Sequence, residues 1–196
     1  MSKWCEHSIA RAIATQTLAS RCVVLVDNCK WTGHECDVLG VTADLRIIDV
    51  EIKISRSDLR ADARKDKWWH RQYGEWIASE RRQEQILTPR THPPKVWKHY
   101  YALPAEIWTP ELADSLPSPA SGVLLLREAD RADIGLVRVS CWRRATPCRD
   151  AYRLTPEQTV GIARLANLRM WEAYRGRDSW REHVNRLSGD TGHQAR

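Results

Sequence analysis

Charged and aliphatic residues alternate in the segment LRIIDVEIKI at residues 45–54. Successive side chains of a β-strand point to opposite faces, so one face is predicted to pack on the core with Ile48, Val50, Ile52 and Ile54. The other face carries Asp49, Glu51 and Lys53. A strand this rich in Ile and Val is expected to be central in its sheet, where charges are costly unless they are paired, solvated in a cleft or bound to a metal ion.

A further carboxylate, Asp37, precedes Val38 and Leu39 in an apolar segment that is predicted to form the neighbouring strand. Its separation from Glu51 is enough for two strands joined by a turn, so the two carboxylates can meet across the ladder. A pair of carboxylates is a hard, oxygen-rich site of the kind that suits Mg²⁺ or Mn²⁺.

Such a site suits the cleavage of a phosphodiester bond. A divalent ion polarises the phosphoryl oxygen, generates hydroxide from bound water and neutralises charge on the leaving oxygen. Lys53 shares the face of Glu51 and can orient or deprotonate the attacking water, or stabilise the transition state. The alternative is the solvated outer face of an antiparallel sheet, against which Leu45 and Ile47 on the same face argue. Asp49 either supports the site or is a charge at an edge of the sheet.

The elements that must position these residues are predicted in the order helix, three strands, helix, strand. The first helix covers residues 3–20, with Ser2 as its N-cap, and the second begins at Ser57, which is expected to cap it. Strands are predicted at residues 22–26, 34–41, 45–54 and 99–103. Three strands in quick succession imply an antiparallel meander, and a strand that follows a helix implies a crossover. The expected fold class is therefore α/β with a mixed sheet.

The remaining segments are predicted to extend this core. Residues 123–127 and 135–142 indicate a hairpin, and a helix is the interpretation of residues 75–86. The last helix has Thr155 as its N-cap, and Gly176 is expected to end it. The 196 residues are expected to form a single domain. Its parts are a core at about 3–104, an insertion at about 72–95, and a hairpin plus helix within 105–188.

The pattern of Asp37 followed by Glu51-Ile52-Lys53 resembles the PD-(D/E)xK nuclease superfamily, whose core has the same order of elements, here over residues 3–103. Within that superfamily, the run EIKISRSDL from Glu51 looks like the MmcB-like DNA repair proteins. KWW at 67–69 and YYALP at 100–104 stand where that group has a Lys/Trp/Tyr-bearing helix and a YxxxP strand. Cys36 replaces the family's proline, which is not a ligand.

This resemblance implies a restriction-endonuclease-like fold and a cofactor, Mg²⁺ (or Mn²⁺). Asp37, Glu51 and the carbonyl of Ile52 would hold the ion, and Lys53 would be the catalytic base or would position water. Many members also carry an acidic residue on the first helix, for which Glu6 is the catalytic candidate. Residues beyond Pro104 lie outside the resemblance.

Basic and aromatic residues follow the motif. Four of them are predicted to bind nucleic acid through their charge: Arg56, Arg60, Arg64 and Lys67. Neighbouring Trp and Tyr side chains offer stacking surfaces, although at helical spacing some must belong to the core. The plainer interpretation of the segment around Arg56 is a capped helix start.

The composition agrees with a polyanionic partner, since 31 Lys and Arg against 25 Asp and Glu give a net charge of +6. The sequence has no apolar run of the roughly 20 residues that a membrane span needs, and no secretory signal, so a cytoplasmic protein is expected, in a bacterium or a phage-infected cell. The six cysteines contain no C-x-x-C pair and are expected to be free thiols. Cys29, His34 and Cys36 have spacings loosely like a zinc site, but no fourth ligand is evident in the sequence.

The predicted function is therefore that of a Mg²⁺-dependent DNA endonuclease in repair, recombination or phage DNA processing. The alternative is a DNA-binding accessory protein that has the nuclease fold and does not cut. An RNA-processing enzyme is a third option. Many nucleases of this fold cut duplexes as dimers, so a homodimer is compatible with the resemblance, although no interface is legible in the sequence.

Overall fold

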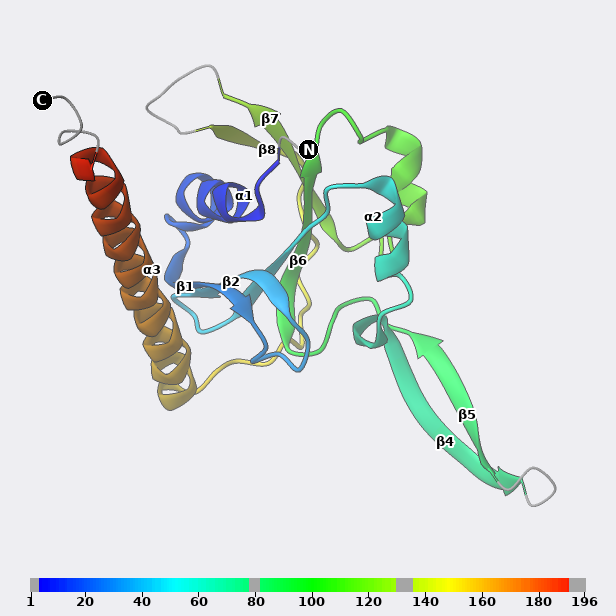
Figure 1. Ribbon diagram of the computed structural model, residues 1–196. Helices are drawn as coiled ribbons and strands as arrows, with labels where there is room; N and C mark the ends of the chain where they lie inside the picture. The colour runs from blue at the N-terminus through cyan, green and yellow to red at the C-terminus, as the bar shows by residue number, and fades with distance from the viewer. Residues whose placement is uncertain (1–3, 78–81, 130–135, 191–196) are drawn as a thin grey trace, which may run out of the picture.

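The computed structural model describes residues 4–77, 82–129 and 136–190, and a mixed six-stranded sheet lies at the centre of the fold (Figure 1). The strand order is β1-β2-β3-β6-β7-β8. The strands are β1 (Cys22–Cys29), β2 (Cys36–Thr42), β3 (Ile47–Ile52), β6 (Val96–Pro104), β7 (Gly122–Glu128) and β8 (Val137–Arg143). The pairs β1–β2, β2–β3 and β7–β8 are antiparallel, whereas β6 runs parallel to both β3 and β7. The predicted meander, crossover and mixed α/β sheet are thus confirmed.

One face of the sheet is covered by α1 (Glu6–Ile13), which continues as a π-helical turn at Ala14–Leu18. The aliphatic face predicted for β3 packs there, in a cluster that joins Ile9 and Ile13 of the helix to Val50 and Ile52 of the strand. The helix begins later than predicted, with Cys5 at the N-cap position, and Ser2 lies outside the described residues.

The central position of β3 agrees with the prediction, because all six of its residues are buried. Ile54 is an exception to the predicted aliphatic face, since its side chain is 46% exposed. The reason is that β3 ends at Ile52 and the chain turns toward α2 (Arg56–Asp62). Ser55, and not Ser57, caps α2: its hydroxyl accepts a 3.1 Å hydrogen bond from the backbone N–H of Asp58. Ser55 has the extended backbone that an N-cap needs, whereas Ser57 is already helical.

The segment after α2 corrects a second prediction. A 3₁₀ turn at Asp66–Trp68 leads into β4 (Trp69–Ile77) and β5 (Arg82–Pro89), where a helix was expected over residues 75–86. The two strands form their own antiparallel sheet, which projects from the body of the molecule (Figure 1). The backbones of the two strands pair with each other, for example at Tyr73 and Gln85. This cross-strand pairing, and not the local sequence pattern, determines the strand conformation of the segment.

The chain ends in α3 (Pro156–Asp190), which packs against β1 at the edge of the sheet. The predicted start is confirmed, because Thr155 and Gln158 exchange backbone and side-chain hydrogen bonds in a capping box. The predicted stop at Gly176 is wrong, since the helix runs through this residue to Asp190. A glycine ends a helix where a positive φ is needed, and Gly176 does not adopt one. Among the described residues, no helix is both long enough and apolar enough to span a bilayer.

Candidate functional site

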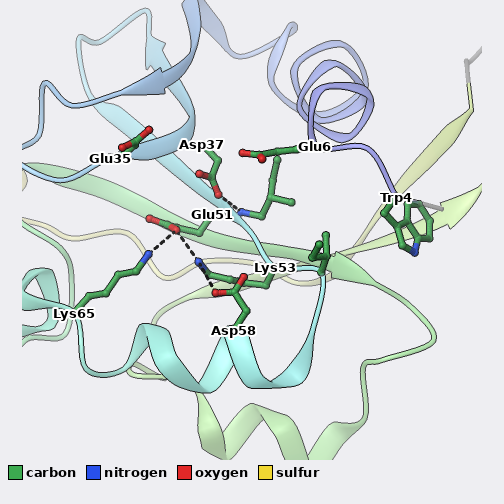
Figure 2. Close-up of a pocket in the computed structure, with 10 residues that line it drawn as sticks. Trp4, Glu6, Glu35, Asp37, Glu51, Lys53, Asp58 and Lys65 are labelled. Carbon is green, nitrogen blue, oxygen red and sulfur yellow. Dashed lines mark hydrogen bonds and ion pairs between the residues drawn. The ribbon is translucent and has the colours of Figure 1, made fainter. Parts of the chain in front are cut away.

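A pocket of about 540 Å³ opens beside the start of β2 and the end of β3 (Figure 2). It collects five residues that the sequence predicted for one site: Glu6, Asp37, Glu51, Ile52 and Lys53. It also takes in residues that the prediction did not include, among them Trp4, Glu35, Ile54, Asp58 and Lys65. The predicted acidic groups Glu6, Asp37 and Glu51 come from α1, β2 and β3, so these three elements must fold together before the pocket exists.

Asp37 is positioned by the antiparallel pairing of β2 with β3. The register pairs Val38 with Val50, so that Asp37 and Glu51 occupy the next position along the ladder. One carboxylate oxygen of Asp37 accepts a 2.6 Å hydrogen bond from the backbone N–H of Ile52. Burial, and then repulsion by Glu51, raise the pKa of Asp37 to about 6. Glu6, at the start of α1, directs its side chain toward Asp37 from the other wall (Figure 2).

Glu51 is only 2% exposed and is surrounded by ammonium groups. Its Oε1 accepts a hydrogen bond of 2.5 Å from Lys67 Nζ, and its Oε2 lies 3.0 Å from Lys53 Nζ and 3.6 Å from Lys65 Nζ. Burial alone would raise the pKa of Glu51, but Lys67 and Lys53 outweigh it and hold the pKa below its ordinary value. Glu51 is therefore a carboxylate in the folded protein.

Lys53 lies just beyond β3, where its backbone N–H donates to the Ala102 carbonyl of β6. Its ammonium sits between two carboxylates, 3.0 Å from Glu51 Oε2 and 3.2 Å from Asp62 Oδ1. Burial opposes the charge on Lys53, yet Glu51 and Asp62 raise its pKa above the ordinary value. This ammonium stays protonated next to the pocket.

Asp62 is a member of the site that sequence reasoning missed. It is fully buried at the end of α2 and accepts hydrogen bonds from Trp68 Nε1 at 3.0 Å and from the Tyr101 hydroxyl at 2.6 Å. Although burial would raise its pKa, Lys67 and Lys53 keep the pKa well below the usual range. Asp62 thus holds the lysines in place beneath the pocket.

The four residues predicted to bind nucleic acid separate into three kinds. The prediction that Lys67 binds nucleic acid is wrong, because its side chain is 1% exposed and its ammonium is held by Glu51 and Asp62. Arg56 is exposed, and its Nε donates a 2.7 Å hydrogen bond to the Ile107 carbonyl. Arg60 and Arg64 are exposed on and just after α2, and none of the four lines the pocket.

Asp49 is completely buried and is not a charge at the edge of the sheet. It points to the same face as Glu51 but does not line the 540 Å³ pocket. Its Oδ2 lies 2.9 Å from His34 Nε2, and its ligand atom also lies within 4.8 Å of those of Glu51 and His99, so Asp49 belongs to a buried polar cluster that adjoins the pocket.

The donor set of Glu6, Asp37 and Glu51 consists of oxygens, which is the chemistry that Mg²⁺ and Mn²⁺ prefer. The raised pKa of Asp37 also fits a cation, because a nearby positive charge would relieve its repulsion by Glu51. Within the described ranges, these three carboxylates do not all approach within 4.8 Å of one another. The residues therefore fit a divalent ion, provided that Glu51 exchanges part of its contact with the lysines for it.

No family model matches the chain, and comparison with curated proteins gives no match. Among solved structures, the chain is similar to a protein of unknown function from Silicibacter pomeroyi. The two are 19% identical, with a TM-score of 0.45 over 98% of this chain and 97% of that chain.

Proposed function

We propose that this protein is a nuclease that hydrolyses DNA phosphodiester bonds with Mg²⁺ or Mn²⁺. The observation that carries the proposal is the convergence of Asp37, Glu51 and Lys53 on one open pocket. Carboxylates from adjacent strands next to a protonated lysine make a site that can hold a cation and a phosphate together.

The order of elements supports the same proposal. Residues 6–104 contain, in this order, a helix, an antiparallel meander, a second helix and a parallel strand. This is the order expected for a restriction-endonuclease-like core. The acidic motif lies at the end of β3, where the chain leaves the sheet for α2. We propose this core for the protein, with β4 and β5 as an insertion.

The residues divide the chemistry among themselves. Asp37, Glu51 and the Ile52 carbonyl would hold the divalent ion, which when bound would supply positive charge to the phosphoryl group and acidify a water molecule. Lys53 is protonated, so its ammonium donates hydrogen bonds to a phosphoryl oxygen or positions the attacking water, and does not act as the base. Glu6 faces the pocket from the opposite wall and can accept a hydrogen bond from that water.

The second candidate is a DNA-binding accessory protein that does not cut. The observation that favours it is the occupation of Glu51 by three ammonium groups, from Lys53, Lys65 and Lys67. A carboxylate that stayed locked in these contacts would leave Asp37 as the main ligand, and a single carboxylate holds Mg²⁺ weakly.

The two candidates separate in an assay that follows the nicking of supercoiled plasmid. The wild type is expected to nick DNA in Mg²⁺ or Mn²⁺ and to stop when EDTA is added. Asp37→Asn and Lys53→Met are each expected to slow nicking by about 100-fold or more while DNA binding persists. Asp114→Asn, an exposed acidic position far along the chain, is the matched control and should cut like the wild type.

Two outcomes would overturn the nuclease proposal. If the wild type binds DNA but does not cut it in the presence of any divalent ion, the accessory function is correct. If Asp37→Asn cuts as fast as the control, the activity comes from elsewhere. Competition with RNA tests the remaining option, since an RNA substrate would displace DNA from the site.

A further inference from the structure

A second group of metal-ligating side chains adjoins the pocket, next to Glu51. His34, Cys36 and Asp49 each offer one ligand atom, and these three atoms lie within 4.8 Å of one another. We propose that they bind a zinc ion. His99 of the neighbouring β6 lies beside this set, where its ligand atom is grouped with those of Asp49 and Glu51. This inference does not depend on the nuclease proposal, because the three ligands do not line the 540 Å³ pocket and Glu51 is not among them.

The distances among these three ligand atoms are close to what zinc requires. Bonds of about 2.0–2.3 Å at tetrahedral angles place ligand atoms roughly 3.3–3.8 Å apart. Cys36 Sγ lies 3.8 Å from His34 Nε2, and the ligand atom of Asp49 lies within 4.8 Å of both. His34 Nε2 and Asp49 Oδ2 are closer, at 2.9 Å, as expected while the two are hydrogen-bonded to each other. A modest opening of that contact gives an ion room between them.

Two buried polar atoms in this cluster have no hydrogen-bond partner within the described part of the chain: Asp49 Oδ1 and His99 Nε2. Asp49 is fully buried and His99 is 1% exposed, so leaving both atoms unpaired is costly. The other ring nitrogen of His99, Nδ1, lies 3.0 Å from Ser121 Oγ. When Nδ1 carries the proton at that contact, the lone pair of Nε2 lies 3.9 Å from Asp49 Oδ2, and a cation bound by Asp49 would reduce the repulsion between these two atoms.

The ligand types favour zinc over Mg²⁺. Thiolate and imidazole are borderline-soft ligands that hold Zn²⁺, whereas Mg²⁺ requires oxygen. One thiolate from Cys36 and one carboxylate from Asp49 balance the two charges of the ion, so the occupied cluster would be neutral in the interior of the sheet. Zinc would thereby join β2, the segment before it, and β3 next to the strand end that carries Glu51.

An entry path also exists. A second pocket, of about 420 Å³, reaches His34 from the side of Lys65 and Pro94, and the His34 side chain is 14% exposed. The ion can therefore reach the cluster without unfolding of the sheet, and His34 can turn away from Asp49 to admit it.

Cobalt titration of the full chain tests this proposal on the wild type. The protein is stripped of metal with EDTA under reducing conditions and titrated with Co²⁺. One equivalent is expected to produce the strong visible bands of tetrahedral cobalt and a near-ultraviolet thiolate-to-cobalt charge-transfer band, both removed by Zn²⁺. A wild type that shows no charge-transfer band would overturn the proposal.

Variants assign the ligands. Cys36→Ser should abolish the charge-transfer band, whereas Cys141→Ser, an exposed cysteine on β8, should retain it. Asp49→Asn and His34→Gln should each weaken Co²⁺ binding by at least about tenfold. Asp37→Asn should leave the band unchanged, which separates this site from the proposed Mg²⁺ site. A band that survives Cys36→Ser would place the cobalt elsewhere and overturn the assignment.

Discussion

The carboxylate of Asp37 accepts a 2.6 Å hydrogen bond from the backbone N–H of Ile52, which fixes it at the end of the β2–β3 ladder beside Glu51. A single contact of this kind sets the direction of the carboxylate, so that both acidic residues face one pocket (Figure 2). The arrangement is costly without a cation, because burial and repulsion by Glu51 act against the charge of Asp37.

That cost predicts that Asp37→Asn stabilises the metal-free protein at pH 8. The pKa of Asp37 is about 6 in the folded protein and 3.8 without burial, so the folded state binds more protons between these values. Stability therefore falls as pH rises through this interval, and the full cost, of up to about 3 kcal/mol, is present above it. Urea unfolding in EDTA should show a gain at pH 8 that becomes smaller at pH 5. A gain that is absent, or larger at pH 5, would contradict the account.

Divalent-ion binding should depend on the same titration. A protonated Asp37 must lose its proton before it can ligate, so Mn²⁺ affinity should be constant above about pH 7 and fall by up to about tenfold for each pH unit below 6. Calorimetric titration of Mn²⁺ between pH 5 and 8 measures this dependence. An affinity that does not change over this range would show that Asp37 is not a ligand.

The charged network beneath the pocket should be a major source of stability. Asp62→Ala would leave the buried Lys67 with one carboxylate fewer and Trp68 and Tyr101 without their acceptor, a loss of about 3–5 kcal/mol. Because the pKa of Asp62 is lowered, its contribution is present above the ordinary carboxyl pKa and is lost as pH falls below it.

Chemical denaturation at pH 7 measures this loss. Asp66→Ala is the control, since the Asp66 side chain is 76% exposed and its removal should change the free energy of unfolding by less than about 0.5 kcal/mol. Equal stability of the two variants would mean that the network is not important for folding.

DNA binding should depend on the exposed arginines on and just after α2. Removing two phosphate contacts with Arg60→Gln and Arg64→Gln should weaken binding and reduce the slope of log affinity against log salt by about 2. Arg175→Gln is the control, because α3 lies on the opposite side of the molecule from α2 (Figure 1). Fluorescence anisotropy at several salt concentrations gives both slopes, and the same decrease for the control would exclude α2 as the binding surface.

The sequence predicted those parts of the fold that depend on local patterns. The alternation of Ile48, Val50 and Ile52 located the central strand, and the capping box at Thr155 located the start of α3. The convergence of Asp37 and Glu51 followed from the same alternation, because adjacent antiparallel strands place paired residues on one face.

The parts that depend on tertiary contacts were missed. The sequence predicts Lys67 to be an exposed residue that binds nucleic acid. Nothing nearby in the sequence indicates that the chain folds back and buries its side chain against Glu51 and Asp62. His99 is likewise distant from Asp49 along the chain, so its position beside Asp49 became visible only when β6 was placed beside β3. Buried charged and imidazole side chains do not produce a periodic sequence pattern, so only their tertiary contacts identify them.

A crystal of the protein soaked in Mn²⁺ and measured at the manganese absorption edge tests the central claim most directly. The account predicts an anomalous peak between the carboxylates of Asp37 and Glu51, with the Lys53 ammonium still beside Glu51. A fully soaked crystal with no peak there, and with Glu51 held by its three lysines as before, would contradict it.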